Sequence, residues 1–142
     1  MMLVTAEKIA SVMSLSTIPR SFAELDKLVT QGLPKHALKA SVDRVCLSGS
    51  DRKNLLYRII PESTYKRRRI HLTSDESERA ERLARIVATT EFVWNSAVDA
   101  RVFLNTPHAM LQGRTPLDVS MTELGARRVE ELLWKLFYGT AA

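Results

Sequence analysis

The chain has 142 residues, with 21 Lys and Arg against 16 Asp and Glu and a net charge of +5. Its length is that of one domain, and an apolar fraction of 45% is typical of a globular protein and excludes a mainly disordered chain. No apolar run approaches the roughly 18 residues needed to cross a bilayer, and the N-terminus lacks the pattern of a signal peptide, so we expect a cytoplasmic protein with no membrane partner.

The first predicted elements are short helices that follow an N-terminal arm. Residues 4–12 could form a short helix, but the run at 14–19 breaks any pattern, and we assign residues 1–20 to an arm of uncertain order. A capping box at Ser21–Glu24 opens a helix that Gly32 ends, and a second helix starts near Pro34. Apolar residues recur at helical spacing in both. They are Phe22, Leu25, Leu28, Val29, Ala37, Leu38, Val42 and Val45.

A short basic segment follows the third predicted helix. That helix is capped by Ser50 and ends at Pro61, which cannot continue a helix but suits the first turn of a new one. Two short helices across a tight break form a helix-turn-helix, whose second helix enters the major groove. Arginines can pair with guanine and neutralise phosphates. The alternative is a solvated basic helix end, because cations favour helix C-termini. The predicted DNA-binding residues are Ser63, Thr64, Tyr65, Lys66, Arg67, Arg68 and Arg69.

The rest of the chain is also predicted to be helical. A capping box at Thr73–Glu76 opens a long helix, Pro107 and Gly113 bracket a loop, and a capping box at Ser120–Glu123 opens the last helix. Gly139 ends that helix. Nothing indicates a strand, so the predicted fold is all-α. The apolar faces consist of Ala80, Leu83, Ala84, Val87, Trp94, Val98, Val102, Phe103, Val129, Leu132, Leu133, Leu136 and Phe137.

Charge divides the chain into two unlike halves. Residues 1–72 carry 13 Lys and Arg against 6 Asp and Glu, a net charge of +7, whereas residues 73–142 carry 8 against 10, a net charge of −2. Such asymmetry suggests two partners with different electrostatics, of which a polyanion is the simplest for the basic half. We therefore assign DNA binding to residues 21–72 and a different partner to residues 73–142.

The sequence contains no recognisable catalytic constellation. His36, His71 and His108 have no metal-ligand spacing, and there is no glycine-rich phosphate loop or nucleophile motif. Cys46 is the only cysteine, so no intrachain disulfide can form. We predict a non-enzymatic protein with no metal and no cofactor.

Several C-terminal motifs resemble one known family. The runs FLNTP at 103–107, LQGRTPLD at 111–118 and TELGARRVEELL at 122–133, together with Gly139, closely resemble the MbcA/ParS/Xre toxin-binding domain. Phe103 and Gln112 depart from the common Trp and Gly of that domain. Upstream, the chain is similar to the helix-turn-helix region of Xre-type antitoxins. The matching positions are Gly32–Pro34, Ile60, Pro61, Thr64, Arg68 and residues 72–77.

The resemblance implies an antitoxin of a type II toxin–antitoxin system. Its expected partners are a RES-domain toxin, which consumes NAD⁺, its own operator DNA and a second copy of the chain. Residues 73–142 are then a toxin-binding and dimerisation domain whose C-terminal tail covers the toxin's active site. The implied toxin-binding residues are Arg127, Arg128, Glu131, Trp134, Gly139, Thr140, Ala141 and Ala142.

Two other functions remain open at this point. The chain could be a dimeric helix-turn-helix transcription regulator without a toxin partner. It could also be an immunity or adaptor protein that has lost DNA binding.

Overall fold

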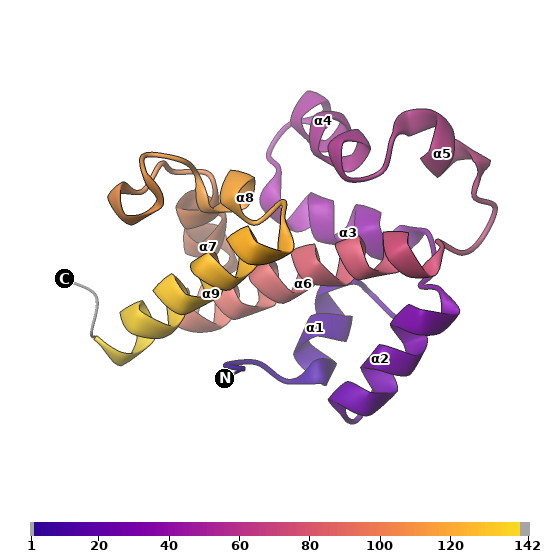
Figure 1. The fold of residues 1–142 in the computed structure, drawn as a ribbon, viewed down its shortest axis with the longest axis horizontal. Coiled ribbons are helices and arrows are strands. Elements are labelled where there is room, and N and C mark those ends of the chain that lie inside the picture. Colours follow the sequence, from indigo (N-terminus) through magenta and orange to yellow (C-terminus); the bar gives the residue numbers. More distant parts are fainter. Residues whose placement is uncertain (1, 140–142) are drawn as a thin grey trace.

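The computed structural model describes residues 2–139, which are arranged around one long central helix, α6 (Figure 1). Helices α1, α2 and α3 pack against α6, and so do α7 and α9. Helices α4 and α5 lie at one end of the molecule and the C-terminal end of α9 lies at the other (Figure 1). The elements are α1 (Ala6–Val12), α2 (Phe22–Gln31), α3 (His36–Val45), α4 (Gly49–Ile59), α5 (Glu62–Arg67), α6 (Ser74–Trp94), α7 (Ala97–Leu104), the 3₁₀ helix η1 (Ala109–Leu111), α8 (Pro116–Val119) and α9 (Glu123–Tyr138).

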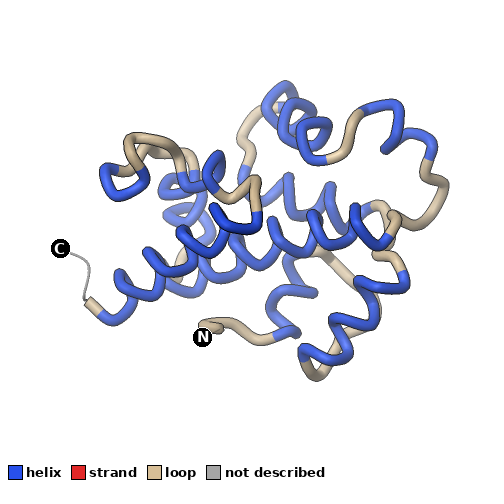
Figure 2. Tube along the Cα trace, viewed as in Figure 1, coloured by secondary structure: helices blue, strands red, loops and turns tan. Residues whose placement is uncertain are grey.

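The described part of the chain contains helices and loops but no strand, as Figure 2 shows, and the all-α prediction is confirmed. No helix in residues 2–139 is long and apolar enough to cross a membrane. The predicted boundary between residues 72 and 73 falls at the start of α6. Because α6 contacts helices from both halves of the chain, the two halves share this helix as a common scaffold.

Local signals explain where most helices begin and end. The capping box at Thr73 and Glu76 is present in full, and Gly32 ends α2 with φ of 106°. Two predicted caps are wrong by two residues. Ser48, not Ser50, accepts the Asp51 N–H at the start of α4. At α9 the cap is Thr122, because the Ser120 hydroxyl donates to the Leu117 carbonyl at the end of α8.

Gly32 also allows a close approach that aligns α3 with the segment after α5. The Lys35 N–H donates to Ile70 O at 2.8 Å, and the Leu72 N–H donates to Leu33 O at 2.9 Å. A Cβ on Gly32 would lie 2.5 Å from Leu72 O. This position therefore requires glycine both for its positive φ and for space.

Residues 1–20 were assigned to an arm of uncertain order, and the described part of this segment, residues 2–20, contains a helix. Helix α1 lies within this segment, is capped by Thr5 and buries Ile9, Ala10 and Val12 in the core. Ala6, Ile9 and Ala10 follow the spacing i, i+3, i+4 of a single helical face, and α2, α3 and α6 pack around this helix. The periodic signal is short because the helix has only seven residues.

The core contains most of the predicted apolar positions, but five of them are wrong. Ala80, Leu83, Ala84 and Val87 of α6 are buried, as are Val129, Leu132 and Leu133 of α9. In contrast, five side chains are 42–64% exposed: Phe22, Trp94, Val98, Val102 and Phe137. Asn95 ends α6 in a left-handed conformation, and α7 then packs inward through Ala100, Phe103 and Leu104 instead.

Candidate DNA-binding and toxin-binding sites

Helices α4 and α5 form the predicted pair of short helices across a tight break. Ile60 adopts an extended conformation and Pro61 then precedes the first residue of α5. The Pro61 carbonyl accepts the first helical hydrogen bond, from Tyr65 N at 2.9 Å. This geometry is that of a helix-turn-helix, with α5 in the place of the recognition helix.

Tyr65, one of the predicted DNA-binding residues, packs within the protein in this structure. Its side chain is buried, and burial raises the pKa of the phenol. The hydroxyl donates to Lys35 O at 3.3 Å, and the Lys35 ammonium lies 4.5 Å from the ring centroid. Tyr65 therefore attaches α5 to the start of α3.

Arg68 is held by an intramolecular partner. Helix α5 ends at Arg67, so Arg68 follows it and reaches Glu76 in the first turn of α6. Two hydrogen bonds of 2.9 and 2.8 Å join the guanidinium to the Glu76 carboxylate, which also accepts from Thr73 N. The hydrogen bonds from Arg68, together with those from Thr73, lower the pKa of the buried Glu76 to about 2. Arg68 thus connects the segment that follows α5 to the first turn of α6.

The remaining predicted DNA-binding side chains point outward. Ser63, Lys66, Arg67 and Arg69 are exposed and Thr64 is half-buried. Lys66 pairs with Glu62 at 3.4 Å in an exposed contact that contributes little to stability. The side chains of Arg67 and Arg69 make no hydrogen bond or ion pair with the described residues 2–139. Their charges are free to meet an external polyanion.

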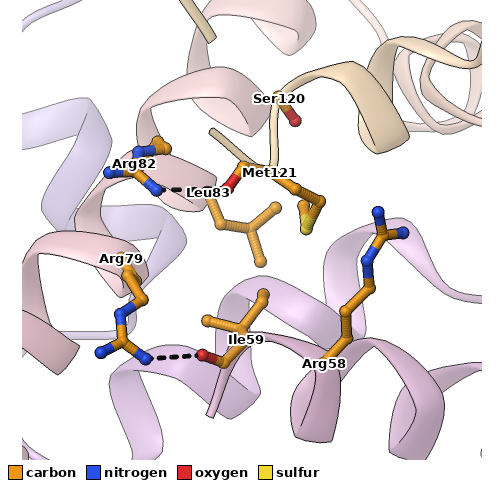
Figure 3. Close-up of a pocket in the computed structure, with 7 residues that line it drawn as sticks. All are labelled: Arg58, Ile59, Arg79, Arg82, Leu83, Ser120 and Met121. Atoms are coloured by element: carbon orange, nitrogen blue, oxygen red, sulfur yellow. Dashed lines mark hydrogen bonds between the residues drawn. The ribbon is translucent and has the colours of Figure 1, made fainter. Parts of the chain in front are cut away.

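A small hollow of about 120 Å³ marks where the helix-turn-helix meets the C-terminal half (Figure 3). On its walls, Arg79 donates to Ile59 O at 2.9 Å and Arg82 donates to Met121 O at 3.3 Å. Nearby, Arg58 of α4 pairs with Asp118 of α8, and these hydrogen bonds, with those from Arg114, lower the pKa of Asp118. The end of α4 is therefore fixed to both α6 and α8.

The predicted toxin-binding residues fall into two groups. Arg127, Glu131 and Trp134 line one open hollow of about 440 Å³ on α9. Arg128 lies apart from them and donates to Gln112 Oε1 after η1. Gly139 ends α9 with φ of 71°, as predicted. Thr140, Ala141 and Ala142 lie outside the described residues.

Trp134 differs from the other predicted toxin-binding residues that the structure describes, because its buried indole N–H is unpaired there. Its indole Nε1 is buried and has no hydrogen-bond partner among the described residues. Its ring packs on Tyr138 at 4.6 Å, Tyr138 meets Phe137 at 5.0 Å, and Phe137 meets Phe92 of α6 at 5.1 Å. The sequence did not single out Phe92, because it lies on a different helix, α6, far from the aromatic run at the end of α9.

The described residues offer no group of three His, Cys, Asp or Glu side chains that could hold a metal ion. His36 contacts Ser14 O at 3.1 Å, and His108 Nδ1 accepts the Met110 N–H at 3.1 Å. Cys46 is buried, and desolvation raises the pKa of its thiol. These groups therefore occupy structural positions.

The fold and the two sites define a small helix-turn-helix protein with a second helical region built on the same central helix. Residues 24–85 match the family model for the antitoxin Xre-like helix-turn-helix domain, and residues 90–139 match that for the antitoxin Xre/MbcA/ParS C-terminal toxin-binding domain. The chain is also similar to antitoxin Xre of Pseudomonas putida, with 33% identity over 135 residues, which cover 92% of this chain and 82% of that protein. The chain belongs to the Xre family of antitoxins.

Proposed function

We propose that this antitoxin neutralises a RES-domain, NAD⁺-consuming toxin with its C-terminal half and represses its own operon, as a homodimer, with its N-terminal half. The match of residues 90–139 to a toxin-binding domain supports the first role. The exposed cations of the helix-turn-helix support the second. In this pair the partner, and not this chain, carries the catalytic residues.

The proposed toxin contacts are Arg127, Arg128, Glu131 and Trp134 on α9, followed by the tail. Gly139 ends α9 in a left-handed conformation. Thr140, Ala141 and Ala142 have small side chains and lose little side-chain entropy on entering a narrow cleft.

Deletion of residues 140–142 is expected to abolish neutralisation without unfolding the protein, because the described core, which ends at Leu133, is left intact. The test is growth and cellular NAD⁺ content of bacteria that express the product of the adjacent gene together with full-length or truncated antitoxin. Circular dichroism of the truncated protein is the control for folding. Full rescue of growth by the truncated chain would remove the tail from the mechanism.

For DNA, we propose that Lys66, Arg67 and Arg69 contact phosphates and that Ser63 and Thr64 donate to phosphates or base edges. Arg68 and Tyr65 have a different role in this proposal. They hold α5 at a fixed angle to α3 and α6 through Lys35 O and the Glu76 carboxylate. Cations that meet phosphates release counterions, whereas a cation that stays paired inside the protein does not.

Arg67→Ala and Arg68→Ala are therefore expected to weaken operator binding in different ways. Loss of Arg67 should lower the slope of log K against log salt by about one unit, because one phosphate contact is lost. Loss of Arg68 should reduce affinity with an unchanged slope, because the recognition helix is displaced. The measurement is fluorescence anisotropy with the promoter fragment at several salt concentrations. Equal slopes for the two variants would contradict the division of roles.

A further inference from the structure

Exposed apolar side chains are concentrated in one part of the molecule. Of the thirteen large apolar residues that are exposed within residues 2–139, eight lie between residues 90 and 139. In residues 24–85 only two are exposed, Leu47 and Ile70, and they lie in separate loops. The basic half thus presents charge, and the C-terminal half presents apolar surface.

The most exposed of these residues in the C-terminal half include two on α7. Val98 and Val102 lie one helical turn apart on α7 and are 64% and 61% exposed. Beside them is a mostly apolar groove of about 250 Å³. We call the combined surface the α7 patch, which consists of Trp94, Val98, Val102, Phe103, Pro107 and His108, and the groove is also lined by the polar side chains of Asp99 and Thr106.

The α7 patch has a rigid base. Phe103 is 9% exposed and packs between Trp94 at 5.6 Å and His108 at 6.0 Å between ring centroids. His108 is held in turn by the Met110 N–H. A preformed groove with an aromatic wall loses little entropy when a side chain enters it. Tryptophan walls in such grooves are frequent centres of binding energy.

We propose that the α7 patch receives an apolar segment of the partner toxin, an inference that rests on the proposed function. The patch lies within the region matched to a toxin-binding domain. It also lies at the same end of the molecule as the C-terminal end of α9, away from α5 (Figure 1). One partner can therefore contact the patch and the C-terminal end of α9 together and leave the helix-turn-helix uncovered.

The contact through the α7 patch adds to the toxin affinity that the tail contributes, and it does not replace the contact made by the tail. The tail enters a polar cleft, whereas two valines and a tryptophan bury apolar surface, which gives a contact that salt does not screen. Toxin binding through the α7 patch should therefore persist at salt concentrations that abolish DNA binding.

The test is a pair of charged substitutions, Val98→Glu with Val102→Glu, in the full-length chain. Both positions are exposed, so the fold is expected to persist, and Leu47→Glu, at 76% exposure outside residues 90–139, is the matched control. The probe is the purified product of the adjacent gene. The double variant should lose at least about tenfold in affinity, and the control should stay within about twofold; each tenfold loss equals roughly 1.4 kcal/mol.

Three further readouts complete the experiment. Val98→Thr with Val102→Thr keeps the side-chain shape and should lose about threefold, which covers the case in which the glutamate variant fails to fold. If the double glutamate variant binds the toxin with wild-type affinity, this inference is overturned but the proposed function is not. A change in the variant's sedimentation without toxin would also overturn it, because the patch would then bind a second copy. Failure of the wild-type chain to bind the adjacent gene product would overturn the proposed function and this inference with it.

Discussion

Gly125→Ala is expected to destabilise the protein by about 3 kcal/mol or more, the upper part of the range for overpacked positions. A Cβ at this position would lie 1.7 Å from Val119 O and 2.8 Å from the Val119 carbonyl carbon. Both atoms belong to the backbone of α8, so no flexible side chain can move aside. The first turn of α9 would have to separate from α8.

That separation would also disturb the cap of α9. The Gly125 N–H donates to Thr122 Oγ1 at 3.0 Å, and the same hydroxyl would lie 2.9 Å from the new Cβ. Loss of a threonine cap alone costs about 1 kcal/mol. Because α9 carries the proposed toxin contacts, we expect Gly125→Ala to reduce neutralisation together with stability.

Urea denaturation of the purified variants measures the effect. Gly49→Ala is the matched control, because no atom lies within 4 Å of the Cβ that it adds at the start of α4. An alanine there should be neutral or slightly stabilising, since alanine is the better helix former. If the two alanine variants unfold at the same urea concentration, the close packing of α8 on α9 is not the reason for glycine at position 125.

The helix boundaries were predictable because their signals are local. Gly32, Pro61, the box at Thr73 and Gly139 each act within one or two turns of the residue that the sequence shows. Local rules still leave ambiguity where two candidates lie close together. Ser48 and Ser50 both suit a cap, and only the folded chain selects Ser48.

The apolar faces were harder to predict, since periodicity cannot distinguish a face that meets the core from one that meets a partner. Val98 and Val102 follow the helical period but point to solvent. The direction of α7 depends on the left-handed conformation of Asn95, which no pattern in the sequence predicts. Predicting the α7 patch therefore needed the tertiary structure.

Arg68 shows a second limit of sequence reasoning. Four consecutive cations suggest four equivalent phosphate contacts, yet one of them is paired with a carboxylate eight residues later. The partner lies on a different helix, and its burial depends on the packing of α6. Composition thus predicted the basic surface, and only the fold separates Arg68 from its neighbours.

Glu76→Gln is expected to lower stability by about 2 kcal/mol at pH 7 and by much less near pH 2. The pKa of Glu76 falls from the ordinary 4.5 to about 2 in the folded protein, chiefly through the hydrogen bonds from Arg68. A depressed carboxyl pKa contributes stability that is present above the unfolded value and lost as the pH falls through the folded value. The shift corresponds to roughly 3 kcal/mol, which we reduce to about 2 because the Arg68 side chain is 28% exposed and partly screened by solvent.

Urea denaturation at pH 7 and at pH 2 checks this prediction, with Glu78→Gln as the control. Glu78 lies two residues along the same helix but is exposed, so its substitution should have little effect at either pH. Glutamine keeps the size of Glu76 but cannot form the charge-assisted pair, which frees Arg68 and the end of α5. Operator affinity at pH 7 should therefore fall in Glu76→Gln, and the salt slope should stay the same or rise as Arg68 becomes available to phosphate. Equal destabilisation at both pH values, or equal effects of the two glutamine variants, would show that the Arg68–Glu76 pair does not hold the recognition helix.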